Sequence, residues 1–161
     1  MINFQEKNPY SPLIPIRGVL IEKRSRYQKI EVYETIDMGN MLVLDNAVQT
    51  TEKDEFIYHE MITYPSFLLA KNHKNALIIG GGDCGVAKEL LKLDRTMDIE
   101  IVEIDKEVIK VSKEFFPWAP KALHTVKTTL SDGAEFLTKN REERDMIIID
   151  STDPTPLAEG L

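Results

Sequence analysis

The sequence predicts an α/β protein: a Rossmann-like, doubly wound parallel sheet preceded by a small antiparallel β-domain. Two observations carry this prediction. Residues 27–50 alternate apolar and polar side chains between turn signals, as half-buried antiparallel strands do. From residue 53 onward, short wholly apolar stretches alternate with helix-like stretches, the pattern of a parallel sheet covered by helices. We therefore expect two domains, at residues 1–52 and 53–161.

The composition excludes several classes of protein. Apolar residues make up 42% of the 161 residues and charged residues 29%, which is typical of a globular chain. The net charge of −7 argues against nucleic-acid binding. No run of about 18 apolar residues predicts a membrane span, and the N-terminus lacks signal-peptide features. The single cysteine, Cys84, excludes an internal disulfide or a cysteine-based zinc site and favours a cytoplasmic location.

In the first domain, we expect strands at residues 27–34, 41–44 and 47–50, with a turn at residues 38–40. The second domain should open with a helix over residues 54–70, which Pro65 should bend or interrupt. The following elements should alternate between strands at residues 76–79, 99–102, 124–129 and 146–149 and helices at residues 86–93, 106–115 and 134–139.

The last strand, residues 146–149, is wholly apolar, which describes a strand buried on both faces inside a sheet. The sequence ends soon afterwards, so nothing later in it would cover that strand, and an exposed apolar edge invites aggregation. We therefore expect that the chain is a fragment, or that a partner or a further segment completes the sheet.

A glycine-rich loop, residues 80–85, follows the first apolar strand of the second domain and opens a helix. Glycines there allow a tight turn and close approach of a ligand to the helix N-terminus, although a plain glycine turn would look the same. Glu103 ends the next strand about 20 residues later, where an acid can accept hydrogen bonds from both hydroxyls of a ribose.

Polar residues also follow the third and fourth strands. Asp132 and Gly133 suit either the edge of an adenine or a simple helix cap. Asp150 and Asp153 lie at the end of the last strand, where open α/β sheets place their sites, although Asp153 before Pro154 could also shape a turn.

Five acids should thus lie at one end of the parallel sheet: Asp83, Glu103, Asp132, Asp150 and Asp153. Such a cluster repels a pyrophosphate and attracts cations. It therefore argues against NAD and favours an adenosyl ligand with a positive centre, together with a cationic co-substrate. Carboxylates can bind metals, but no ligand spacing here requires one, and we expect no metal.

Together these segments resemble spermidine synthase, the polyamine aminopropyltransferase family, whose fold is methyltransferase-like. The resemblance runs from about residue 15 onward and rests on Tyr27-Gln28, residues 48–61, the glycine-rich loop, residues 102–105 and Asp150-Ser151-Thr152-Asp153-Pro154. It implies a transferase that moves the aminopropyl group of decarboxylated S-adenosylmethionine to putrescine, giving spermidine and 5′-methylthioadenosine. No separate cofactor is implied, because the nucleoside is a co-substrate, and a homodimer or homotetramer is expected.

The resemblance also implies roles for residues of the donor site. Gln28 and Glu103 hold the nucleoside donor, with Glu103 on the ribose. Asp132 and Gly133 meet the adenine.

By the same resemblance, Tyr58, His59, Asp83 and Asp153 line the polyamine pocket, and Asp150 is the catalytic acid-base residue. This fits the chemistry, because an alkyl amine with a pKa near 10 must lose a proton before it attacks a sulfonium carbon. Asp150, with Tyr58 nearby, is placed to accept that proton.

The sequence departs from the family pattern at two places and in length. Cys84 stands where the family loop usually has glycine, which we expect to be tolerated if Cys84 has a negative φ. Residues 155–157 replace the usual small residue, Gly and Pro, which weakens any adenine contact there. The family also continues beyond this length, so part of the acceptor site should be missing, and the acceptor is left open between putrescine, cadaverine and spermidine.

Three alternatives remain open from the sequence. A same-fold putrescine N-methyltransferase would share the nucleoside site but use S-adenosylmethionine, whose carboxylate Asp83 would repel. A truncated, non-catalytic partner of an intact synthase would fit the length and the altered glycine loop. A nicotinamide dehydrogenase rests on the glycine spacing alone.

Overall fold

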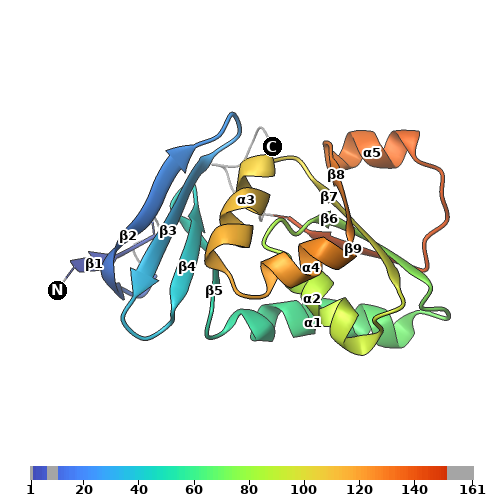
Figure 1. The fold of residues 1–161 in the computed structure, drawn as a ribbon, viewed down its shortest axis with the longest axis horizontal. Coiled ribbons are helices and arrows are strands. Elements are labelled where there is room, and N and C mark those ends of the chain that lie inside the picture. Colours follow the sequence, from blue (N-terminus) through green and yellow to red (C-terminus); the bar gives the residue numbers. More distant parts are fainter. Residues whose placement is uncertain (1, 7–10, 152–161) are drawn as a thin grey trace. The chain divides into compact units, whose positions relative to one another are not determined.

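The computed structural model describes residues 2–6 and 11–151 (Figure 1). It divides the chain into two compact units, an N-terminal unit that runs to Glu55 and a C-terminal unit that begins at Phe56. Within the described residues, no helix is both long enough and apolar enough to cross a membrane.

The N-terminal unit is a five-stranded antiparallel sheet in which the strands lie in sequence order. The strands are β1 (Ile2–Phe4), β2 (Ile14–Arg24), β3 (Lys29–Thr35), β4 (Asn40–Leu44) and β5 (Ala47–Thr51). Its core is a small cluster of Phe4, Ile16, Tyr33, Met41 and Val43. The predicted antiparallel β-region is therefore present.

The long strand β2 was not predicted. It contains Pro15 and Gly18, which are poor strand formers, and its pairing with β3 shifts register twice, between Ile16 and Gly18 and between Val19 and Ile21. Each shift moves the side chains to the other face, so the simple alternation that identifies a strand is lost.

The C-terminal unit is a four-stranded parallel sheet in the order β8-β7-β6-β9, flanked by five helices in the described residues. The strands are β6 (Asn75–Gly80), β7 (Asp98–Glu103), β8 (Lys127–Leu130) and β9 (Met146–Asp150). The helices are α1 (Glu55–Leu69), α2 (Gly85–Leu93), α3 (Lys106–Phe115), α4 (Ala119–Thr125) and α5 (Gly133–Lys139).

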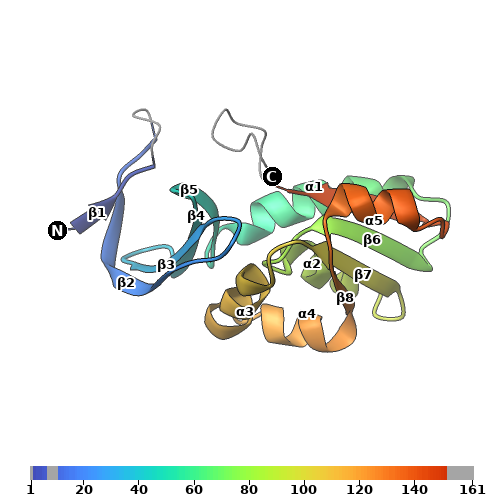
Figure 2. The ribbon, with the colours of Figure 1, turned by 90° about the horizontal axis from the view of Figure 1, so that it is seen from above.

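The connections of this sheet reverse direction after β8. The chain steps outward from β6 through β7 to β8 and then returns to β9 on the other side of β6. Because such crossovers are right-handed, the reversal moves the helices to the opposite face. Figures 1 and 2 show α2, α3 and α4 together on one face of the sheet and α5 on the other. This is the predicted doubly wound fold, with its site expected at the carboxyl ends of β6 and β9, the neighbouring strands from which the connections run in opposite directions.

Two predictions for this unit need correction. Residues 124–126, predicted as the start of a strand, belong to or follow helix α4, and β8 begins only at Lys127. The signal for α4 is Pro120 in its first turn. Proline is favoured there because an amide N–H at that position would have no hydrogen-bond partner within the helix. Pro65 does not interrupt α1, which continues to Leu69 while its buried side chains His59 and Thr63 anchor it. The bend, which was the other alternative for Pro65, stays a prediction.

Strand β9 is the outermost strand of the sheet on its side. Met146 and Ile148 are buried, whereas Ile147 and Ile149 are 51% and 63% exposed. The apolar sequence predicted burial on both faces, but in the described chain only one face is buried, because no further element packs against the other.

Candidate active site

The glycine-rich loop binds the end of β6 to the end of β9. Gly80 and Gly81 have positive φ values of 81° and 70°, which only glycine adopts without strain. This turn lets the amide of Gly81 donate to the main-chain oxygen of Asp150 at 2.8 Å. The loop thus lies directly beside the carboxylate that ends β9.

Glu103, the last residue of β7, reaches under the same loop. Its carboxylate accepts hydrogen bonds from the amide of Gly82 at 3.1 Å and the amide of Asp105 at 2.8 Å. Burial raises the pKa of Glu103 above its usual range, although these amides favour the charged form. The side chain is therefore held in place by the main chain and remains able to accept further donors.

His59 and Asp83 form a buried pair between α1 and the loop. The two side chains meet at 3.1 Å, between Nε2 of His59 and Oδ2 of Asp83. The other carboxylate oxygen, Oδ1, accepts from the amide of Gly85 at 2.9 Å. A Cβ on Gly85 would overlap the imidazole ring, so glycine is required for this close approach.

Asp150 lies next to this pair and accepts a hydrogen bond from Tyr58 Oη at 2.9 Å. Burial and the charge of Asp83 raise its pKa to about 6, against the hydrogen bond from Tyr58 and the charge of His59. Burial also disfavours the charged form of Asp83, but the hydrogen bond and charge of His59, the amide of Gly85 and the charge of Lys88 outweigh it and lower its pKa.

The site therefore holds two neighbouring carboxylates whose pKa values are shifted in opposite directions. At neutral pH, Asp83 is charged and Asp150 is mostly charged but close to its titration point. Such a pair attracts a cationic amine and offers one oxygen able to take up a proton.

Among the described residues, His59, Asp83 and Asp150 form a group that could hold a metal. One ligand atom from each lies within 4.8 Å of the others. His59 and Asp83 already pair with each other, and Asp150 accepts from Tyr58. The absence of a metal from the protein's chemistry stays a prediction.

Asp132 and Gly133 lie at the end of β8, at the same edge of the sheet. The carboxylate of Asp132 caps α5 by accepting from the amide of Glu135 at 3.0 Å, which was the structural alternative for this residue. Gly133 begins α5 and passes close to Ile79 of β6. This placement leaves their contact with adenine a prediction.

For two predicted site residues the structure gives no test of their role. Gln28 is buried in the N-terminal unit, before β3, and its role stays a prediction. Asp153 and residues 155–157 lie outside the described residues.

Cys84 does not meet the condition of a negative φ under which we expected it to be tolerated in the glycine-rich loop. Its φ is 68°, in the left-handed region, rather than negative. The side chain is fully buried and Sγ lies 3.6 Å from the main-chain oxygen of Gly82. Burial raises the pKa of the thiol, aided by the charges of Asp83 and Glu103, which disfavours the reactive thiolate at neutral pH.

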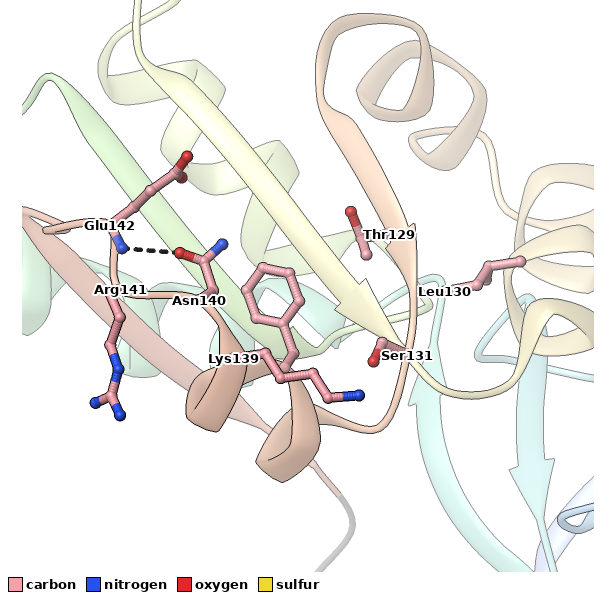
Figure 3. A pocket seen from close by; sticks show the side chains of 8 residues that line it. Thr129, Leu130, Ser131, Lys139, Asn140, Arg141 and Glu142 are labelled. Atoms are coloured by element: carbon pink, nitrogen blue, oxygen red, sulfur yellow. Dashed lines mark hydrogen bonds between the residues drawn. The ribbon is translucent and has the colours of Figure 1, made fainter.

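A shallow pocket of about 500 Å³ lies elsewhere, between β8 and α5 (Figure 3). None of the predicted site residues lines it. Its wall includes the charged side chains of Lys139, Arg141 and Glu142. The candidate site is thus identified by its chemistry and not by this hollow.

Sequence reasoning missed Trp118, which donates from Nε1 to the main-chain oxygen of Asp83 at 2.9 Å. The signal that could have found it is its position. It is the only tryptophan in the sequence, and it stands in Phe116-Pro117-Trp118-Ala119-Pro120, where the prolines break one helix and begin the next.

Comparisons with known proteins identify the two units separately. Residues 55–161 match the protein family described as "Spermine/spermidine synthase domain", and residues 4–52 match the one described as "Spermidine synthase tetramerisation domain".

Individual relatives agree with these matches. The polyamine aminopropyltransferase of Hydrogenobaculum sp. (strain Y04AAS1) is 42% identical over 165 residues, covering 99% of this chain and 59% of that protein. The polyamine aminopropyltransferase of Thermoplasma acidophilum is 47% identical over 145 residues, covering 88% of this chain and 53% of that protein. This chain therefore spans little more than half the length of these curated relatives.

Solved structures show the same similarity. The spermidine synthase from Thermotoga maritima superposes with a TM-score of 0.89 at 35% sequence identity, over 96% of this chain and 55% of that one. A spermidine synthase in complex with the transition-state analogue AdoDATO superposes with a TM-score of 0.90, also at 35% identity, over 96% of this chain and 54% of that one.

Proposed function

Because the chain belongs to the spermine/spermidine synthase family, we propose that the protein of which it is part is a polyamine aminopropyltransferase. It would transfer the aminopropyl group of decarboxylated S-adenosylmethionine to putrescine, giving spermidine and 5′-methylthioadenosine. The donor is a co-substrate, and no further cofactor is needed for this displacement. The relatives named polyamine aminopropyltransferase support the activity, and the acidic site supports a cationic acceptor.

In this proposal the donor binds at the carboxyl ends of β7 and β8. Glu103 accepts hydrogen bonds from the two ribose hydroxyls, for which its fixed, buried carboxylate is suited. Asp132 and Gly133 meet the adenine, and Gln28 completes the donor site. Since no pyrophosphate is involved, the acids around the glycine-rich loop are no obstacle to binding.

The acceptor amine binds where Asp83 and Asp150 lie together. Asp83 and Asp153 attract its ammonium groups, with His59 orienting Asp83 and Tyr58 orienting Asp150. A bound diamine is thereby aligned with the donor carbon, so that the reaction of two molecules proceeds as if within one molecule.

Proton transfer then makes the amine a nucleophile. An ammonium group loses one proton to Asp150, and the freed nitrogen lone pair attacks the aminopropyl carbon attached to sulfur. The new C–N bond forms as the C–S bond breaks, and the electron pair of that bond returns to sulfur as a neutral thioether. The pKa of Asp150, about 6, leaves it ionised at neutral pH and able to accept the proton.

The observation that carries the proposal is the contact of Tyr58 with an Asp150 carboxylate of raised pKa beside the charged Asp83. The test is to incubate the full-length protein with putrescine and either decarboxylated or ordinary S-adenosylmethionine, and to measure spermidine and 5′-methylthioadenosine. We expect both products with the decarboxylated donor alone. Methylated putrescine, or no product from either donor, would contradict the proposal.

We further propose that the protein acts in the cytoplasm as a homodimer or homotetramer. The match of residues 4–52 to a family described as a tetramerisation domain supports assembly through the N-terminal unit. The single cysteine, buried in the glycine-rich loop, fits a reducing compartment. Sedimentation of the full-length protein would measure the number of subunits, and a monomer would contradict the proposed assembly.

A further inference from the structure

Trp118 reaches from the turn between α3 and α4 to the glycine-rich loop. Its indole N–H donates to the main-chain oxygen of Asp83 at 2.9 Å. Thirty-five positions of sequence separate the two residues, so this bond ties a distant turn to the residue proposed to receive the amine.

The indole is itself held firmly by its neighbours. Its ring centroid lies 5.1 Å from that of the buried Phe116, and Lys88 Nζ lies 5.3 Å from its centroid in a cation–π contact. Lys88 also pairs with the fully buried Glu89 at 2.8 Å. A ring packed between helix α2 and the residue that ends α3 has little freedom to follow a moving loop.

Asp83 needs such support because of the residue that follows it. Cys84 has a φ of 68°, which is unfavourable for a residue with a Cβ. The peptide between the two residues would relieve this strain if it could rotate. The bond from Trp118 to the oxygen of that same peptide opposes the rotation, and so preserves the contacts of the Asp83 carboxylate with His59 and Gly85.

We propose that Trp118 is a positioning residue for the acceptor amine, acting through Asp83 by fixing the peptide that carries it. The inference rests on the proposed function in that Asp83 is taken to bind an ammonium group. Loss of the bond should leave Asp83 in several orientations, so that the amine binds more weakly and Asp150 feels less negative charge.

The first test is Trp118→Phe in the full-length protein, which removes the N–H and keeps an aromatic ring. We expect the KM for putrescine to rise about three- to tenfold, as for the loss of one hydrogen bond. The KM for the donor should change less than twofold, because Glu103 is held by other amides. The acidic limb of the kcat/KM profile should move to lower pH, because the charge of Asp83 raises the pKa of Asp150.

Val111→Ala is the matched control, since Val111 is buried in α3 and its truncation lowers stability within the same unit. This variant should lower the melting temperature without changing the ratio of the two KM values or the pH profile. Trp118→Phe would overturn the proposal if it raised both KM values equally, or if it left the putrescine KM and the acidic limb unchanged.

A second measurement separates this inference from the proposed function. Trp118 contributes an indole ¹H–¹⁵N resonance, which is identified in the full-length protein by its loss in Trp118→Phe. Putrescine should shift that resonance in the wild type but not in Asp83→Asn. If the protein showed no aminopropyl transfer but the shift still depended on Asp83, the coupling of Trp118 to amine binding would be supported and the proposed function would be contradicted. If the enzyme were active but putrescine did not shift the indole resonance, only the coupling would be overturned.

Discussion

Two glutamates on strand β7 lie three positions apart and show opposite electrostatics. Glu100, 2% exposed, accepts from Thr129 at 2.7 Å and pairs with Arg144 at 2.8 Å and Lys127 at 2.9 Å. Glu103, 8% exposed, is held by main-chain amides. Burial opposes the charge of both, but in Glu100 the hydroxyl and the cations outweigh it and lower the pKa, whereas the pKa of Glu103 is raised.

The difference separates residues that stabilise the fold from residues that serve the site. Glu100 ties β8 and the segment before β9 to the centre of the sheet, with its charge neutralised inside the protein. Glu103 and Asp150 lie at the carboxyl ends of their strands and have raised pKa values. Their charges are not fully compensated by protein groups, so a ligand can supply the missing positive charge or hydrogen-bond donors. Substitutions in the two groups should therefore affect different properties.

The largest expected effect is on turnover. Asp150→Asn should lower kcat by about 10²- to 10⁴-fold, the usual contribution of a general base, with the affinity for the donor little changed. Stability should not fall. A folded pKa of about 6, above the ordinary 3.8, means that ionised Asp150 opposes folding at neutral pH, so its removal should leave the melting temperature equal or higher. Steady-state kinetics and thermal unfolding check this, and unchanged turnover would remove Asp150 from the catalytic role.

The opposite pattern is expected at the other glutamate. Glu100→Gln should lower the free energy of unfolding by about 3 kcal/mol, because it breaks a buried ion pair, while kcat per folded molecule stays the same. The lowered pKa of Glu100 contributes stability above its ordinary value of 4.5. The difference from wild type should therefore shrink as the pH falls below that value.

Urea unfolding at several pH values measures this effect. The matched control is Glu142→Gln, because Glu142 pairs with the same Arg144 from the surface and should cost less than about 1 kcal/mol. Equal losses in both variants would contradict the distinction between the buried and the exposed partner.

Donor affinity should depend on Glu103. Glu103→Gln removes the charge that strengthens the proposed ribose hydrogen bonds, and we expect binding of 5′-methylthioadenosine to weaken about tenfold or more. Because the wild-type carboxylate carries a raised pKa, stability should be unchanged or slightly increased. Calorimetric titration measures the affinity, and an unaltered dissociation constant would show that Glu103 does not touch the donor.

A smaller effect is expected on the pH profile. The kcat/KM should rise with pH through about 6 as Asp150 ionises. Tyr58→Phe removes a hydrogen bond that lowers this pKa, so the acidic limb should move to higher pH. A limb that stays in place, or moves the other way, would mean that another group controls it.

The smallest expected effect is that of metal removal. His59, Asp83 and Asp150 have the donor types of a metal site, but the proposed displacement needs their charges for the amine. Extensive treatment with EDTA should leave the activity of the full-length protein unchanged. A loss that added divalent ions restore would mean that these residues hold a metal.

Particular elements show what could be predicted. Strands β6 and β9 were found from four-residue apolar runs, and the acids that follow them meet because parallel strands end at the same edge. Strand β2 was missed because its register shifts erase the alternation. Helix α4 was missed because its last residues, His124 and Thr125, lie just before β8 and were assigned to that strand. Pro65 does not interrupt α1, because tertiary packing compensates for the one hydrogen bond that it removes.

The sequence by itself determined the fold class and the location of the acidic edge, because both follow from the order of apolar runs and from residues adjacent to them in the chain. Only the tertiary structure decided which carboxylates are neutralised and which are not. Arg144 meets Glu100, Tyr58 meets Asp150 and Trp118 meets Asp83 across gaps of 44, 92 and 35 positions. Burial and charge at those contacts depend on packing, which no local pattern records.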